Sequence, residues 1–97
     1  MVKLIKKTLL LFAEKYPSSV SALNNWYQVA KNADWNKFAD LKNDFNSVDY
    51  VGNDRYVFNI KGNNFRIVAM IFFNIRTVYI RFVGTHAEYD KIDSSLI

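Results

Sequence analysis

Cysteine is absent from the 97 residues of this sequence, and histidine occurs only once, as His86. Without cysteine the chain has neither a disulfide framework nor a thiolate metal site, and its composition fits a reducing cytoplasm. A catalytic zinc site takes several protein ligands, so one histidine among scattered carboxylates argues against such a site. We therefore expect a cytoplasmic protein that uses no metal and no cofactor.

The sequence also lacks a long apolar run. Near its start, basic residues precede "TLLLFA", an apolar run of six residues that Glu14 and Lys15 follow at once. This run is too short for the core of a signal peptide or for a membrane span. We expect ordinary folded structure here and no membrane partner.

The composition is that of one folded domain. Hydrophobic residues make up 51% of the chain and aromatic residues 16%, which excludes a disordered chain. A chain of this length buries one modest core, and no repeat, low-complexity stretch or linker divides it, so we expect a single domain over residues 1–97. The net charge of +4 weakly favours an anionic partner and identifies none by itself.

The first half of the chain has helical periodicity. Residues 2–5 suit a short strand and residues 7–15 a helix. Pro17 and the two serines after it are typical of the start of a second helix. Its buried face is marked by residues at three- and four-residue steps: Val20, Leu23, Tyr27 and Ala30. A further short helical turn is expected within residues 34–45.

From residue 48 the pattern becomes that of β-strands. Three runs rich in Val, Ile, Phe and Tyr are separated by turn residues: "DRYVFNI", "NFRIVAMIFF" and "TVYIRFVG". A shorter strand is expected before them, around Asp49–Val51. Gly62 and Asn63 suit a two-residue hairpin loop, which would place Asn59 directly opposite Arg66. This order predicts an α+β fold with helices on one face of an antiparallel meander, followed by a short terminal helix.

The stretch "THAEYD" has the pattern of a capping box. Thr85 is the expected N-cap, and Glu88 follows three residues later to reach back to the Thr85 amide. His86 then lies in the first turn of the terminal helix, and Tyr89 and Asp90 share its helical face. The free amides and the positive dipole end of a helix favour an anion.

Two arginines lie on the strands before this helix. Arg66 interrupts an apolar central strand, where a guanidinium group is costly unless it is partnered or opens onto a polar cleft. Arg81 lies on the next strand. A two-residue loop near Asn74–Arg76 would place both arginines on one face of the sheet, and a three-residue loop would place them on opposite faces. The sequence does not choose between these loops.

A site made of Arg66, His86 and Tyr89 would suit the cleavage of an RNA phosphodiester. The 2′-hydroxyl needs a base, the leaving 5′-oxygen an acid and the pentavalent phosphate a fixed cation. Because RNA supplies its own nucleophile, such a reaction requires no metal. The same residues also fit a surface histidine in a capped helix, with both strand arginines in salt bridges.

The sequence resembles the HigB-type toxins, a branch of the RelE superfamily of mRNA interferases from bacterial toxin–antitoxin modules. Four segments carry the resemblance over nearly the whole chain: "LLLFAEKYP", "ALNNWYQVAKNADW", "RYVFNIKGNNFRIVAMIFF" and "YIRFVGTHAEYDKID". The specific parts are "FNIKGNNFRIV" and "VGTHAEYD". The resemblance implies a RelE-like α+β domain, with two N-terminal helices packed on a twisted antiparallel sheet and a short C-terminal helix.

The resemblance also implies an activity and partners. The chain would be an endoribonuclease that enters the ribosomal A site, cleaves translated mRNA and is neutralised by a HigA-type helix-turn-helix antitoxin. By position, Arg66 corresponds to the strand arginine that holds the scissile phosphate, and Tyr89 to a C-terminal catalytic tyrosine. His86 occupies a place where classical RelE proteins carry a basic residue. We expect His86 and Tyr89 to share acid–base catalysis while Arg66 stabilises the transition state.

Three further residues have open roles. Asp90 either orients His86 or is a charge on the helix surface, and Lys61 and Arg81 either contact phosphates or are solvated or salt-bridged. The strand "YVFNI" lacks the lysines that classical RelE chains carry before Arg66. Catalysis would then depend more on His86 or on ribosomal groups. Two other functions fit the sequence: a non-catalytic RNA- or ribosome-binding module, and a structural subunit of a repressor complex.

Overall fold

The computed structural model describes residues 3–5, 7–61 and 64–97. The N-terminal half contains β1 (Lys3–Ile5), α1 (Lys7–Lys15), the 3-10 turn η1 (Pro17–Ser19), α2 (Val20–Asn32) and α3 (Phe38–Asp44). The second half contains β2 (Val48–Gly52), β3 (Arg55–Ile60), β4 (Phe65–Phe72), the 3-10 turn η2 (Phe73–Ile75), β5 (Thr77–Thr85) and α4 (His86–Tyr89). The predicted α+β class is confirmed, as is the change from helices to strands at residue 48. Within the described ranges, no helix is long and apolar enough to cross a membrane.

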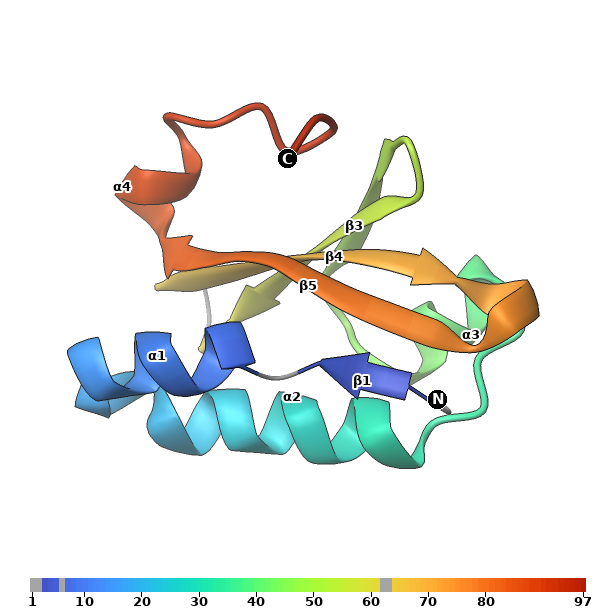
Figure 1. Ribbon diagram of the computed structural model, residues 1–97, viewed down its shortest axis with the longest axis horizontal. Coiled ribbons are helices and arrows are strands. Elements are labelled where there is room, and N and C mark those ends of the chain that lie inside the picture. The colour runs from blue at the N-terminus through green and yellow to red at the C-terminus, as the bar shows by residue number, and fades with distance from the viewer. Residues whose placement is uncertain (1–2, 6, 62–63) are drawn as a thin grey trace.

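The five strands form one sheet in the order β1-β5-β4-β3-β2. Figure 1 shows this sheet between the N-terminal helices on one side and α4 with the residues after it on the other. Strands β2 to β5 are the predicted antiparallel meander. The predicted antiparallel sheet is confirmed for these four strands, but β1 adds a parallel pair with β5, in which Lys3 lies opposite Thr77. This pairing joins two strands that lie far apart in the sequence, and local periodicity carries no information about such a contact.

The register of the central hairpin is the predicted one. Asn59 on β3 lies directly opposite Arg66 on β4. The turn expected at Gly62 and Asn63 lies outside the described residues. On its other side, Arg66 faces Gly84 of β5. Arg66 is therefore flanked by a residue of a neighbouring strand on each side, in the middle of the sheet.

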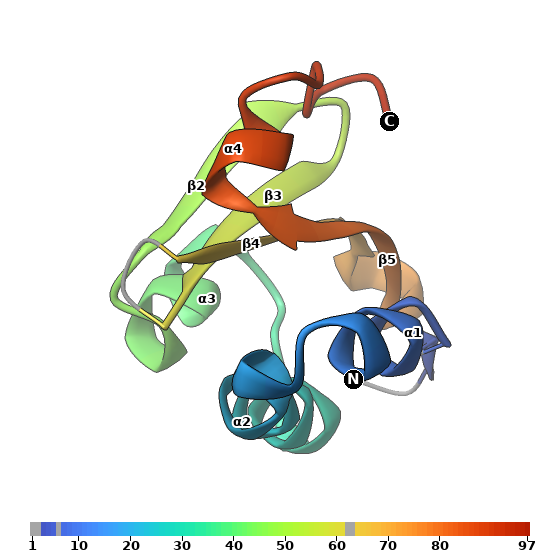
Figure 2. The same cartoon turned by 90° about the vertical axis from the view of Figure 1, so that its left-hand side faces the viewer.

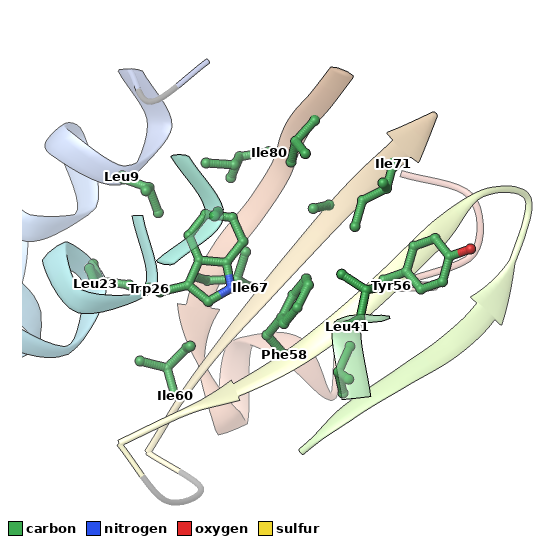
Figure 3. Close-up of a cluster of buried hydrophobic side chains, with 14 of the residues drawn as sticks. Leu9, Leu23, Trp26, Leu41, Tyr56, Phe58, Ile60, Ile67, Ile71 and Ile80 are labelled. Atoms are coloured by element: carbon green, nitrogen blue, oxygen red, sulfur yellow. The ribbon is translucent and has the colours of Figure 1, made fainter. Parts of the chain in front are cut away.

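Helices α1 and α2 cover one face of the sheet (Figure 2). Trp26 of α2 is only 1% exposed and meets Phe58 edge to face, with ring centroids 5.2 Å apart. Figure 3 shows Trp26 beside Leu23 and Ile67 in this core. Each such side chain, fully buried, contributes about 1.5–3 kcal/mol of hydrophobic stabilisation.

The buried face of α2 differs from the predicted one. Leu23 and Ala30 are buried as expected, but Val20 is 49% exposed and Tyr27 only partly buried. Trp26 completes the buried stripe in their place. Val20 is the first residue of α2 and lies in a groove between α1 and α2, away from the sheet. The three- and four-residue spacing correctly predicted a buried stripe on α2, but this stripe consists of Leu23, Trp26 and Ala30.

The opposite face of the sheet has a small apolar layer of its own. Val57 and Val68 are 4% and 0% exposed, although neither belongs to the core under the helices. On this side α4 and the residues after it pass over the sheet (Figure 1). The residues after α4 are tied to the β2–β3 turn, where Asn53 Nδ2 donates to the Ser95 carbonyl at 2.9 Å. Arg66, next but one to Val68 along β4, shares this second face.

Candidate active site

Helix α4 begins with the predicted capping box. The Thr85 hydroxyl accepts from the Glu88 amide at 3.2 Å, and Glu88 Oε1 accepts from the Thr85 amide at 2.9 Å. The hydrogen bond from the Thr85 amide holds the pKa of the Glu88 carboxyl below its usual range. Together these bonds fix where the strand ends and where His86 begins the helix.

His86 is held by its backbone and by its ring. Its amide donates to the Asn64 carbonyl at 3.2 Å, which ties the start of α4 to the residue preceding β4. Its Nδ1 lies 3.1 Å from Asp90 Oδ2, and the His86 side chain is 51% exposed. Since Nδ1 faces the carboxylate, Nε2 is the nitrogen suited to exchange a proton with a ligand. This geometry supports an orienting role for Asp90.

Arg66 and Tyr89 come together over the second face of the sheet. Arg66 is 9% exposed, and its guanidinium carbon lies 5.6 Å from the centroid of the Tyr89 ring. A guanidinium group over an aromatic face is attracted by the ring quadrupole, which offsets part of the cost of burying the charge. The ring of Tyr89 thus covers the cation that the sequence placed in an apolar strand.

Two residues of this cluster were not identified from the sequence. Phe82 lies 6.5 Å from Tyr89 between ring centroids, and its ring lies over Gly84. A Cβ atom at Gly84 would be 2.9 Å from Phe82 Cε1 and 3.1 Å from Cε2, so the ring needs a glycine beneath it. A glycine inside a strand often marks such a close approach, and that signal was present in "RFVG".

The hydroxyl of Tyr89 is also engaged. It donates to Ser94 Oγ at 3.2 Å. Ser94 lies beyond α4, in a part of the chain to which sequence reasoning gave no role. The phenol is therefore contacted on its ring by Arg66 and Phe82 and at its oxygen by Ser94.

Among the contacts of the described residues, none joins Arg81 or Lys61 to Arg66, His86 or Tyr89. Phe72 pairs with Thr77, so residues 73–76 form the β4–β5 loop, and neither of the two loop lengths considered is present. A register shift between Val68 and Ala69 makes Arg81 the additional residue of a β-bulge, exposed to solvent. Lys61 Nζ donates to the Ser18 carbonyl at 3.2 Å, beside the N-terminal helices. Phosphate contacts by either residue stay predictions.

The cluster has the groups needed for acid–base chemistry on an anion. The side chains of His86 and Tyr89 can each donate and accept a proton, and the buried cation of Arg66 offers electrostatic stabilisation beside Tyr89. Over the part of the chain that the structure describes, no group of three or more His, Asp or Glu side chains is placed to hold a metal ion.

Comparison with known proteins points to one family. The model of the HigB_toxin family, described as the RelE-like toxic component of a toxin–antitoxin system, matches residues 19–92. An mRNA interferase HigB of Escherichia coli O6:H1 is 34% identical over 82 residues, which cover 82% of this chain and 80% of the relative. The mRNA interferase toxin HigB of Escherichia coli K12 is 42% identical over 81 residues, with coverages of 80% and 77%. The same values hold for the mRNA interferase HigB of Shigella flexneri.

Proposed function

This chain belongs to the HigB family of toxins, the RelE-like toxic components of toxin–antitoxin systems, and from that premise we propose that it is an mRNA interferase. It acts in the cytoplasm as a single RelE-like domain over residues 1–97. It enters the ribosomal A site, cleaves the mRNA under translation and so inhibits protein synthesis. The names of the curated relatives support this activity.

We propose a reaction that uses only RNA and side chains of this chain. Of His86 and Tyr89, one removes the proton of the 2′-hydroxyl, whose oxygen attacks the adjacent phosphorus. The other donates a proton to the 5′-oxygen as its bond to phosphorus breaks, leaving a 2′,3′-cyclic phosphate and a 5′-hydroxyl. Arg66 stabilises the charge on the pentavalent phosphate. The observation that carries this assignment is the Arg66 guanidinium over the ring of Tyr89, three residues after His86 on α4.

Membership of a toxin–antitoxin family implies an antitoxin partner. We propose that this partner is a helix-turn-helix protein of HigA type. Its binding to the toxin prevents growth inhibition when both proteins are expressed together.

Expression in a bacterial host tests the proposed function. Wild type is compared with a His86→Gln, Tyr89→Phe double variant, and a Tyr50→Phe variant is the matched control because Tyr50 is 53% exposed and lies on β2. Growth is followed together with mRNA 5′ ends mapped by primer extension. We expect growth arrest with new 5′ ends for wild type and the control, and neither for the double variant.

Two results would contradict the proposal. Growth arrest without new 5′ ends, unchanged in the double variant, would identify a non-catalytic RNA- or ribosome-binding module. Normal growth of cells that accumulate the folded wild-type protein without an antitoxin would reject toxicity itself.

A further inference from the structure

We propose that residues 93–97, called here the C-terminal segment, position the hydroxyl of Tyr89 for proton transfer, with Ser94 as its direct partner. This inference rests on the proposed function, because it assigns a role to Ser94 in the same reaction. Ser94 is a positioning residue that acts through Tyr89. No part of this assignment was expected from the sequence.

The C-terminal segment forms a compact turn. The amide and the hydroxyl of Ser95 both donate to Asp93 Oδ1, at 3.1 and 2.7 Å. The Leu96 amide donates to the Asp93 carbonyl at 3.1 Å. The two bonds from Ser95 also hold the pKa of the Asp93 carboxyl below its usual range. The turn therefore has an internal structure that fixes the direction of its neighbour Ser94.

The C-terminal segment is also anchored to the sheet. Asn53 Nδ2 donates to the Ser95 carbonyl at 2.9 Å, and Arg55 donates to the Ile97 carbonyl through Nε at 2.8 Å and through Nη2 at 2.5 Å. The third bond from Arg55, from Nη1 to the Asn53 carbonyl at 2.8 Å, braces the two anchoring residues against each other. These bonds join the segment to the turn between β2 and β3, which lies far from α4 in the sequence.

With these anchors in place, Tyr89 is held at both ends of its side chain. Its ring is packed against Arg66 and Phe82, and its oxygen is bonded to Ser94 Oγ at 3.2 Å. A serine hydroxyl both donates and accepts, so it can hold the phenolic oxygen while Tyr89 gives up or recovers a proton. Without Ser94 the ring contacts remain, but the direction of the O–H bond is no longer fixed. Misplacing a reacting group lowers the rate of the chemical step more than it weakens binding.

Cleavage by purified protein on ribosomes programmed with mRNA tests this role. The variants are Ser94→Ala, Ser94→Thr and, as a matched control, Ser21→Ala, which makes the same change on the exposed surface of α2. We expect Ser94→Ala to lower the cleavage rate at saturation about five- to tenfold, the value of one hydrogen bond, with the half-saturating concentration unchanged. Ser94→Thr, which keeps the hydroxyl, restores the rate, and Ser21→Ala has no effect.

The anchor is tested in the same assay with Arg55→Met. We expect this variant to lower the rate in the same way, and the Ser94→Ala, Arg55→Met double variant to lose no more than Ser94→Ala alone, because both changes release the same hydroxyl. Urea unfolding of every variant confirms that the rates are those of folded protein.

The outcomes separate this inference from the proposed function. If wild type cleaves no more than the His86→Gln, Tyr89→Phe variant, the proposed function fails and the role of Ser94 with it. If wild type cleaves and Ser94→Ala cleaves equally well, only the positioning role is overturned. A faster Ser94→Ala variant also overturns it, since the C-terminal segment would then shield Tyr89.

Discussion

Replacing Gly84 with alanine adds one methyl group beside Arg66, and this group meets the ring of Phe82. The new Cβ would lie 2.9 and 3.1 Å from two ring carbons of Phe82, whereas carbon atoms in contact are about 3.5–4.0 Å apart. Gly84 lies on β5 and pairs with Arg66 of β4. Because pairing with β4 holds the backbone there, the ring of Phe82 must move instead.

The displaced ring determines the size of the effect. Overpacking a close-packed site costs about 1–3 kcal/mol, and because Phe82 is only partly buried, its ring can turn toward solvent. We therefore expect Gly84→Ala to lower the free energy of unfolding by about 1–2 kcal/mol. The ring would also lose its contact with Tyr89, so the cleavage rate should fall as well. Urea unfolding and the ribosome cleavage assay measure the two effects.

A double-mutant cycle identifies the cause. Phe82→Ala removes the ring that the new methyl group meets, so Gly84→Ala should cost almost nothing when it is made in that background. The reasoning would be refuted by a Gly84→Ala variant as stable as wild type. Additive losses in the double variant would also refute it, since they would mean that Gly84 is required for a reason other than the ring.

Two further predictions concern single residues of the site. Arg66→Lys keeps the positive charge but not the planar guanidinium over Tyr89. We expect this variant to stay folded and to cleave mRNA about tenfold more slowly or worse. An unchanged cleavage rate would remove Arg66 from the proposed mechanism. Glu88→Gln tests the capping box, in which the pKa of the Glu88 carboxyl is lowered. The ionised carboxylate therefore stabilises the fold fully above the ordinary glutamate pKa of about 4.3, and this stabilisation is lost as the pH falls below that value. Wild type should therefore be more stable than Glu88→Gln by at most about 1 kcal/mol at pH 7, and the difference in unfolding free energy should shrink as the pH falls below about 4.3. A difference independent of pH would contradict the assignment.

The parts of the fold that the sequence predicts are those fixed by local patterns. Runs rich in Val, Ile, Phe and Tyr identified β3, β4 and β5, and the turn residues set the register of Asn59 against Arg66, which the structure confirms. The capping box at Thr85 was equally local, because its two hydrogen bonds join residues three positions apart. These signals depend on near neighbours in the chain, so a single sequence contains them in full.

The parts that the sequence did not predict depend on contacts between distant segments. The bulge at Arg81 changes the register by one residue without any glycine at that position to mark it. The C-terminal segment has no periodicity, and its bonds to Asn53 and Arg55 place it over the sheet. The hydrogen bond between Tyr89 and Ser94 follows from that placement, so the sequence alone did not predict it.

The position of β5 has a consequence for how the toxin is made. This strand lies between β4 and β1, and it leads directly into the helix that carries His86 and Tyr89. A ribosome synthesises β1 before β5, so β1 has no partner in the sheet until β5 has emerged. A nascent chain therefore lacks both a complete sheet and the site built upon it. An unfinished toxin chain is consequently not yet an active enzyme, so it does not cleave the mRNA from which it is being translated.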